Sequence, residues 1–358
     1  MKLRPSAAGR WMHCPASVRM AAEYGRDQQE TKAAAEGTRA HLVAEYAARR
    51  EFFGDTRIVV PDDDEMRDAA TGWVHVLEDA KEKHHPSASL LLEVKVDTTV
   101  PSCAGTADAV IVGPGRVDVL DLKYGRGEVD PEENKQLMLY ALGVYRQYSM
   151  VFDIDVIGLT IYQPRLSKAA KLWETTPERL LAFAGEAEEM ADEALYAEHP
   201  RIRPSEDACR FCPAAGVCRA RAEWETALAF GDPNVLTAYE VASILRRVPS
   251  LLRWCEAVRE SAKFTIQSGS VIPGWSVKTK KGSTRIVDPR GLKSRLEELG
   301  YTDALKPANL PQVRKVLGDK FDDIAGEYVE RGDDQLMLVD DQQELEKMFG
   351  IVESEKDE

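Results

Sequence analysis

The feature that most constrains the fold is a turn, Gly113-Pro114-Gly115, set between two apolar runs rich in Val, Ile and Leu. Residues 107–112 precede this turn and residues 117–123 follow it, so the pattern predicts two strands joined by a tight hairpin. Residues 90–96 and 155–162 have the same strand-like composition, whereas residues 61–83 and 176–198 carry helix patterns.

The predicted hairpin brings two carboxylates together. If the loop is centred between Pro114 and Gly115, Asp108 and Asp121 stand directly opposite each other on one face of the sheet. Cross-strand partners have Cβ atoms about 4.5–5.5 Å apart. Two carboxylates at that distance repel each other unless a cation lies between them, and Mg²⁺ and Mn²⁺ prefer such oxygens.

Lys123 follows Asp121 by two residues, so the two side chains share a face of the strand. A structural Asp–Lys pair at a strand end is the alternative interpretation. The position of Asp108 opposite Asp121 counts against that alternative, because Lys123 then lies beside two carboxylates and a structural pair needs only one.

Two helices are expected to flank the hairpin. An apolar stripe over residues 40–47 predicts a helix that carries His41. Asp130-Pro131-Glu132-Glu133 has the pattern of an N-cap, a proline at the first helical position and an acid at the third, so a helix is expected from there to about Tyr148. Gln136 and Tyr140 would lie one turn apart on it.

The ordered set resembles the PD-(D/E)XK nuclease superfamily, and within it the RecB-type exonucleases, including the CRISPR adaptation nucleases with iron–sulfur clusters. The residues that carry the resemblance are Gly37-Thr38-Arg39-Ala40-His41, Gly105-Thr106-Ala107-Asp108, Asp121-Leu122-Lys123 and Gln136-x-x-x-Tyr140. It implies an α/β fold with a restriction-endonuclease-like core, in which helices flank a mixed central sheet. Many relatives carry Glu where this chain has Asp121.

The resemblance also implies roles for these residues in DNA hydrolysis. Asp108 and Asp121 would ligate Mg²⁺ or Mn²⁺, with the Leu122 carbonyl as a further ligand and His41 ligating or orienting at the same centre. Lys123 would position the attacking water or neutralise developing charge. Gln136 and Tyr140 would brace Lys123 or contact DNA.

Four cysteines form a second pattern. Cys209, Cys212 and Cys218 follow a C-x2-C-x5-C spacing, and Cys14 lies 195 residues upstream of the first of them. Four thiolates suit either a [4Fe–4S] cluster or Zn²⁺, and spacing alone does not separate them. RecB-type nucleases with a cluster place one cysteine before the core and three after it, so the resemblance implies a [4Fe–4S] cluster that staples the nuclease domain.

Charge and composition divide the chain. The net charge is −14, but residues 319–358 carry 15 acids and four bases, which leaves the rest close to neutral. A composition change after Gly231 predicts a nuclease domain over 1–230 and a smaller α+β accessory region over 235–358, with a hairpin at 274–287. Basic side chains gather in two places, either as DNA contacts or as ordinary solvated surface: residues 276–295, and Arg201, Arg203, Arg210, Arg219 and Arg221.

These observations predict a metal-dependent DNA nuclease, more an exonuclease on ends or single strands than a sequence-specific endonuclease. Ser6–Trp11 and Ile272–Trp275 are similar to a phage-associated family of iron–sulfur nucleases, which implies work in phage recombination, replication or processing, with phage proteins or a homo-oligomer as possible partners. Two rivals stay open: a catalytically silent DNA-binding or assembly protein, and a zinc-stapled regulatory protein. No apolar stretch of membrane length or secretory leader is seen, so a cytoplasmic location is expected.

Overall fold

A five-stranded mixed sheet lies at the centre of the computed structural model, which describes residues 1–24, 32–226, 237–280, 282, 284–301, 310–332 and 335–340. Its strands are adjacent in chain order: β1 (Ser89–Asp97), β2 (Ala104–Gly113), β3 (Gly115–Leu122), β4 (Ile154–Tyr162) and β5 (Lys171–Thr175). Strands β3 and β4 pair in parallel and the other neighbours are antiparallel. The expected mixed sheet is confirmed, although β5 was not predicted.

The β2–β3 hairpin has the register that its turn predicts. Gly113 pairs with Arg116 and Ala109 pairs with Leu120, so the next residues along the two strands are Asp108 and Asp121. Gly115 has a φ of +81°, a left-handed conformation that glycine adopts without a steric penalty. The turn therefore fixes which side chains of the two strands lie opposite each other, five and six residues away from it.

Helix α5 (Lys135–Tyr148) makes the crossover between the parallel strands β3 and β4. It begins four residues later than the predicted cap at Asp130, which is therefore wrong. Asn134 is the N-cap, and its side chain accepts hydrogen bonds from the backbone N–H groups of Gln136 and Leu137. Glu133 has a φ of +50°, so a right-handed helix does not continue through it.

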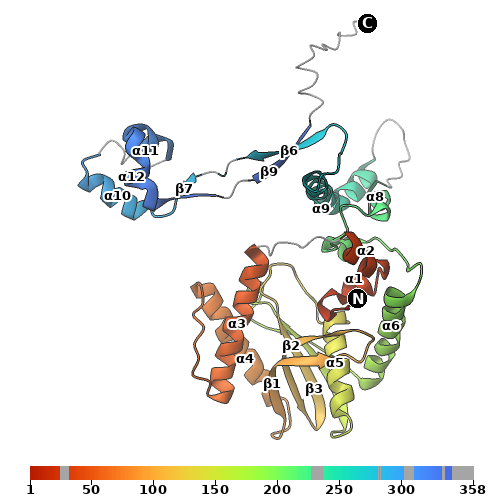
Figure 1. The fold of residues 1–358 in the computed structure, drawn as a ribbon. Helices are drawn as coiled ribbons and strands as arrows, with labels where there is room; N and C mark the ends of the chain where they lie inside the picture. The colour runs from red at the N-terminus through yellow and green to blue at the C-terminus, as the bar shows by residue number, and fades with distance from the viewer. Residues whose placement is uncertain are drawn as a thin grey trace. The chain divides into compact units, whose positions relative to one another are not determined.

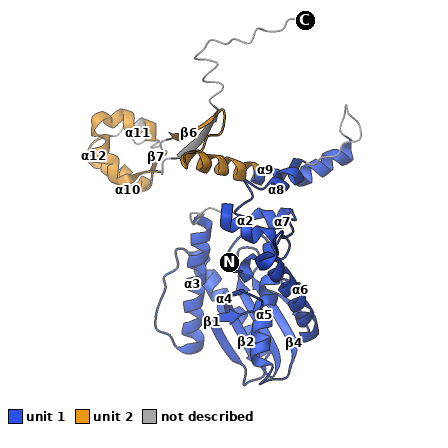
Figure 2. Ribbon diagram, turned by 45° about the vertical axis from the view of Figure 1, so that its right-hand side comes forward, with its two compact units in different colours: residues 1–254 blue, residues 255–358 orange. Residues whose placement is uncertain are grey.

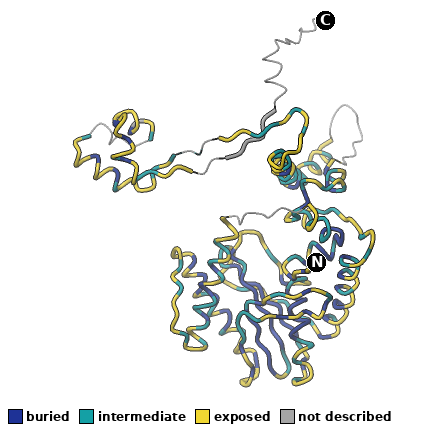
Figure 3. Tube along the Cα trace, viewed as in Figure 1, coloured by how far each residue is buried: buried dark blue, intermediate teal, exposed yellow. Residues whose placement is uncertain are grey.

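Helices cover both faces of the sheet, α3 (Lys32–Phe53) and α4 (Asp64–Glu82) on one and α5 with α6 (Pro177–Tyr196) on the other (Figure 1). Alternate residues of the hairpin supply the two cores: Val117 and Val119 pack toward α5 and α6, and Leu120 and Leu122 toward α3 and α4. The sheet is the most continuously buried part of the chain (Figure 3). Because odd-numbered residues of β3 face α5, Asp121 lies on the α5 side.

The segment before α3 and the segment after α6 lie together. The first contains α1 (Ala8–Trp11) and α2 (Ala16–Tyr24), and the second contains α7 (Glu206–Arg210) and α8 (Arg219–Thr226). The backbone N–H of Ala16 donates to the carbonyl of Arg201, and Arg19 donates to the carbonyls of Ala197 and Glu198. These bonds hold residues far apart in the sequence side by side.

The chain divides into two compact units, residues 1–254 and 255–358 (Figure 2), and the division falls inside α9 (Ala238–Gln267). The predicted change of domain between 230 and 235 lies outside the described residues and stays a prediction. So does most of the acidic C-terminal tail. None of the helices described is long and apolar enough to cross a membrane.

The hairpin predicted at 274–287 is wrong. Strand β6 (Trp275–Lys280) pairs with β9 (Gln335–Asp340), and β7 (Thr284–Ile286) pairs with β8 (Val329–Arg331). In this arrangement Arg285 stands opposite Glu330 and forms an ion pair with it at 2.9 Å. Pairing β6 with β7 would have brought Arg285 toward the lysines of β6, and like charges across a sheet are destabilising. The remaining elements of this unit include α10 (Pro289–Glu298), α11 (Leu310–Leu317) and α12 (Phe321–Ala325).

Candidate active site

Asp108 and Asp121 converge at the end of the β2–β3 hairpin away from the turn. The Oδ2 atom of Asp108 accepts a 2.8 Å hydrogen bond from the backbone N–H of Leu122, so its carboxylate reaches across to the neighbouring strand. The side chain of Asp121 is only 4% exposed, whereas that of Asp108 is 17% exposed. One buried and one partly exposed carboxylate therefore meet at the edge of the core.

Lys123 and Gln136 complete a network around Asp121. The Nζ atom of Lys123 lies 2.7 Å from Oδ2 of Asp121 and donates to Oε1 of Gln136 at 3.2 Å. The Nε2 atom of Gln136 donates to Oδ1 of Asp121 at 2.9 Å. Gln136 is in the first turn of α5, so the Asn134 cap that starts this helix also places an amide between the lysine and the carboxylate.

His41 joins the same site from the other layer of helices. It lies on α3, and its Nδ1 is 3.3 Å from Oδ2 of Asp108. Burial lowers the pKa of His41, but the hydrogen bond that its ring donates to Asp108 and the negative charges of Asp108 and Asp121 outweigh burial, so the pKa is raised. A metal ion bound by Asp108 and Asp121 would therefore favour the neutral form of His41, in which a ring nitrogen is free to bind it.

The electrostatics of Asp121 favour a cation. Burial raises its pKa to about 6, against the charge of Lys123, and the nearby carboxylate of Asp108 raises it further. Oδ2 of Asp121 is buried and faces the Lys123 ammonium at 2.7 Å. A carboxylate oxygen has two lone pairs, so Asp121 can hold a divalent ion beside the lysine.

Tyr140 lies behind the network rather than within it. It is buried in the core that packs against α5 and is 4% exposed. A Cβ atom built on Gly105 would come within 2.8 Å of the tyrosine hydroxyl, so glycine is required for this close approach. Burial raises the pKa of Tyr140, and the charges of Asp121 and Asp108 raise it further, which keeps the phenol neutral.

Glu93, to which the sequence gives no role, lies at the same site. It is in β1 across from Asp108, and it lines a small pocket with His41, Glu45 and Asp108. Burial raises its pKa to about 7, with further contributions from the charges of Asp108 and Glu45. Its φ of +51° interrupts the regular strand, and no propensity rule predicts such a distortion at a glutamate. Only a register for β1 against β2 would have pointed to it.

The side chains are close but do not form a ready-made coordination sphere. Among the residues that the structure describes, no three His, Cys, Asp or Glu side chains are arranged to hold a metal ion. The predicted Leu122 ligand would act through its backbone carbonyl, and its role stays a prediction.

The four patterned cysteines line one small cavity. Cys14 comes from the segment before α2, and Cys209, Cys212 and Cys218 come from the segment that follows α6. Burial raises the pKa of Cys14 and of Cys212, and the nearby thiols raise it further. The backbone N–H of Arg203 lies 3.4 Å from Sγ of Cys14 as a hydrogen-bond donor. The residue types fit a thiolate-bound metal centre.

Two of the arginines near these cysteines are engaged in the fold. Arg221 is 2% exposed and forms a buried ion pair with Glu225, and the same guanidinium donates to Ser250 at 2.6 Å. Arg201 pairs with Glu193. Arg221 therefore fits neither alternative, DNA contact or solvated surface, because its guanidinium is buried against Glu225 and Ser250. In the basic segment, Arg285 and Arg295 also have acidic partners, at 2.9 and 3.2 Å.

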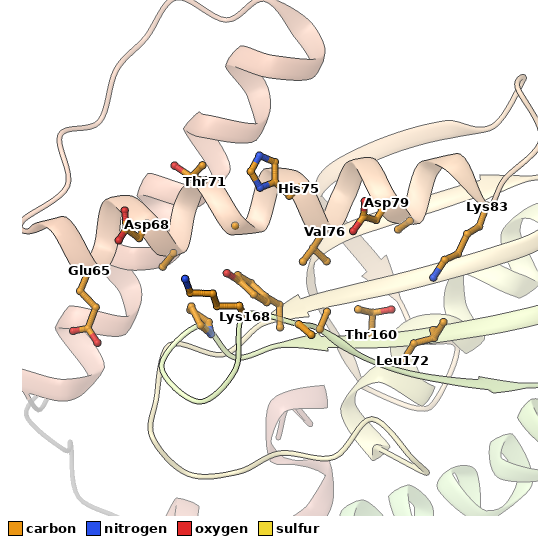
Figure 4. Close-up of a pocket in the computed structure, with 17 residues that line it drawn as sticks. Glu65, Asp68, Thr71, His75, Val76, Asp79, Lys83, Thr160, Lys168 and Leu172 are labelled. Carbon is orange, nitrogen blue, oxygen red and sulfur yellow. The ribbon is translucent and has the colours of Figure 1, made fainter.

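A cavity larger than the small pocket at Glu93 lies elsewhere, away from the predicted site residues. It has a volume of about 700 Å³ and lies between α4 and the strands β4 and β5. Figure 4 shows Asp68, His75 and Asp79 along α4 facing a wall that includes Lys168 and Thr160. None of the predicted site residues lines it, and its mixed acidic and basic lining does not select a ligand class.

Comparison with known proteins places the sequence in a family. The chain belongs to the family described as "Protein of unknown function (DUF2800)", which matches residues 1–344.

Solved structures also resemble the chain. An alkaline exonuclease from Laribacter hongkongensis, LHK-Exo, is 13% identical, with 52% of this chain and 90% of that chain covered and a TM-score of 0.25. Its complex with dAMP is 14% identical over the same shares, also with a TM-score of 0.25. The structure named SSO0001 is 15% identical, with 62% and 87% covered and a TM-score of 0.27. Scores this low do not decide what the chain does.

Proposed function

We propose that this member of the DUF2800 family is a metal-dependent DNA nuclease that acts as an exonuclease on DNA ends or single strands. One observation carries the proposal: Asp108, Asp121 and Lys123 meet at one end of a single hairpin, where the Asp121 carboxylate is almost fully buried beside a second carboxylate. A structural Asp–Lys pair needs neither the second carboxylate nor His41 beside it. The resemblance to PD-(D/E)XK nucleases adds support through the same residues.

Mg²⁺ or Mn²⁺ bound here would supply Lewis acidity and a water of lowered pKa. Oxygens of Asp108 and Asp121 would hold the ion, together with the Leu122 carbonyl and His41. Both carboxylates are held from behind by hydrogen bonds, from Leu122 N–H and from the Gln136 amide, so their oxygens are already oriented.

Lys123 has the geometry to act on the reacting phosphate. Its side chain is 29% exposed, so it reaches the edge of the site, and Gln136 accepts a hydrogen bond from its ammonium. A cation in this position orients the attacking water and offsets negative charge that develops on the phosphate oxygens. Tyr140 is a buried, neutral phenol, so it supports this region from within the core and is too buried to contact DNA.

The test is digestion of end-labelled single-stranded, double-stranded and flapped DNA with Mn²⁺ or Mg²⁺. We expect cleavage by the wild type, and a loss of at least about 100-fold in Asp121→Asn and Lys123→Ala, since each removes charge stabilisation at the reacting centre. Asp79→Asn, a carboxylate of the large cavity below α4, is the control and should cleave normally. Absence of metal-dependent cleavage on all three substrates would favour a silent DNA-binding or assembly protein.

We also propose a [4Fe–4S] cluster on Cys14, Cys209, Cys212 and Cys218. The shared cavity and the N–H donor at Cys14 support it, because hydrogen bonds to sulfur stabilise thiolate ligands. An anaerobic preparation should be brown and contain iron and acid-labile sulfide. A colourless preparation holding zinc would instead support the zinc-stapled alternative. The likeness of Ser6–Trp11 and Ile272–Trp275 to a phage-associated family is the support for a role in phage DNA processing.

A further inference from the structure

Phe211 is a large aromatic side chain that the fold leaves uncovered. It is 75% exposed, although it stands between two of the cysteines that line the buried cavity. The backbone N–H of Phe211 donates to the carbonyl oxygen of Cys209, and Arg10 donates from Nη1 to the carbonyl oxygen of Phe211 at 3.1 Å. The ring is therefore presented to solvent from a backbone that is held at both ends.

Positive charge surrounds this ring. The guanidinium carbon of Arg210 lies 5.2 Å from the centroid of the Phe211 ring, within the range of a cation–π contact. Arg203 and Arg210 are both exposed and form no ion pair within the described residues. Two acids lie on the same short helix: Glu206 forms an ion pair with Arg253, and the charge of Asp207 acts on His13 together with those of Lys135 and Arg203.

The same surface reaches the candidate active site. A Cβ atom on Gly127 would lie 3.8 Å from Nη2 of Arg210, so Arg210 sits beside the loop that follows β3. Gly127 is four residues from Lys123, a separation that a chain spans in at most about 14 Å. The charge of Lys135 acts on His13, so the start of α5 lies close to His13. The next residue, Gln136, contacts both Asp121 and Lys123. Arg210 and the Phe211 ring therefore lie beside the loop that leads from Lys123.

We propose that Phe211 stacks on a base of single-stranded DNA whose phosphates pass Arg10, Arg210 and Lys135 on the way to Asp121. This inference rests on the proposed function and narrows its substrate to single strands. Base stacking on an aromatic ring is sequence-tolerant, because every base has a flat face. In a duplex both faces of an internal base are already covered by neighbouring pairs, so the ring gains nothing there.

Binding is measured without cleavage, by fluorescence anisotropy of a labelled oligothymidylate and of a matched duplex in EDTA. Phe211→Ala should weaken single-strand binding by about 5- to 100-fold, the range expected for loss of one stacked base. Phe211→Trp should restore it, and duplex binding should change in neither variant. Phe53→Ala removes another exposed phenylalanine, at the end of α3, and should leave both affinities unchanged.

A second measurement separates this inference from the proposed chemistry. The substrate bis(4-nitrophenyl) phosphate carries no nucleobase. Its rate of hydrolysis with Mn²⁺ should therefore be the same for Phe211→Ala as for the wild type, and lower for Asp121→Asn. Unchanged single-strand affinity in Phe211→Ala would overturn the stacking role even if DNA is cleaved. Weakening of single strand and duplex alike, with no rescue by tryptophan, would also overturn it. If Phe211→Ala loses single-strand binding selectively but the wild type hydrolyses no substrate, the stacking site is supported and the proposed nuclease activity is overturned.

Discussion

Asp121 is held between opposing influences, because burial and Asp108 favour its protonated form while Lys123 favours the carboxylate. A divalent ion would add to the influence of Lys123 and would compete with a proton for the same oxygen. Metal affinity at this site is therefore a proton-linked quantity.

We predict that the affinity for Mn²⁺ falls as the pH drops through the pKa of about 6 that Asp121 has in the metal-free protein. Above that pH the Asp121 carboxylate is ionised, and the remaining pH dependence comes from His41, whose raised pKa makes its proton a competitor of the ion. Below it, Asp121 should add a further fall of about tenfold per pH unit, because its carboxyl proton must also be displaced. Isothermal titration calorimetry between pH 8 and pH 5 measures this.

Glu93 supplies the control for this titration, since its pKa of about 7 would also produce a pH dependence if it bound the ion. With Asp121 as the group responsible, Glu93→Gln keeps the fall below pH 6. An affinity that stays level from pH 8 to pH 5 in the wild type would contradict the assignment to Asp121.

At the scale of elements, α5 is the part that ties the site to the sheet. It carries Gln136 at its start and Gly143 near its end, where the helix crosses β1. A Cβ atom on Gly143 would lie 2.3 Å from the carbonyl oxygen of Asp97, far inside van der Waals contact. The glycine therefore allows the helix backbone to approach the strand and sets where Gln136 lies.

Gly143→Ala should destabilise the protein by about 1–3 kcal/mol, since the helix must move away from the sheet to admit a methyl group. Gly185→Ala in α6 is the matched control, because a Cβ atom there would have nothing within 4 Å. That control should be neutral or stabilise by up to about 1 kcal/mol through helix propensity. Urea unfolding measures both, and equal effects would show that packing at Gly143 is loose.

Prediction from sequence succeeded where a short-range rule fixes long-range geometry. The Gly113–Gly115 turn sets the hairpin register, and strand alternation then places Asp108, Asp121 and Lys123 together. It failed where the decisive partner is distant: Arg285 pairs with Glu330, 45 residues away, and no local signal announces it. Glu93 was not assigned for a related reason, since its place depends on how β1 pairs with β2.

At the scale of the whole molecule, the cysteine cavity joins the two ends of the larger compact unit. Cys14 lies before the sheet and the other three cysteines come after it, so the sheet and its helices lie within one long loop of chain. Closing such a loop removes conformational entropy from the unfolded state, and a metal centre that forms only in the folded protein adds its binding energy to stability.

Cys14→Ser should therefore lower both the iron content and the melting temperature, and treatment of the wild type with an iron chelator should lower the melting temperature similarly. Cys255→Ser is the control, because that cysteine lies on α9 and does not line the cavity. Iron analysis and thermal unfolding under anaerobic conditions provide the readouts. A normal melting temperature in an iron-free Cys14→Ser protein would remove the stabilising role of the centre.

The order of the cysteines also has a consequence for biosynthesis. Cys14 leaves the ribosome 195 residues before the next member of its set is made. At bacterial elongation rates of about 5–20 residues per second, this leaves the thiol waiting about 10–40 s without its partners. A metal centre of the kind proposed on these four cysteines would therefore assemble only after Cys218 has been translated, and a nascent chain that stalls earlier exposes the Cys14 thiol without its partners.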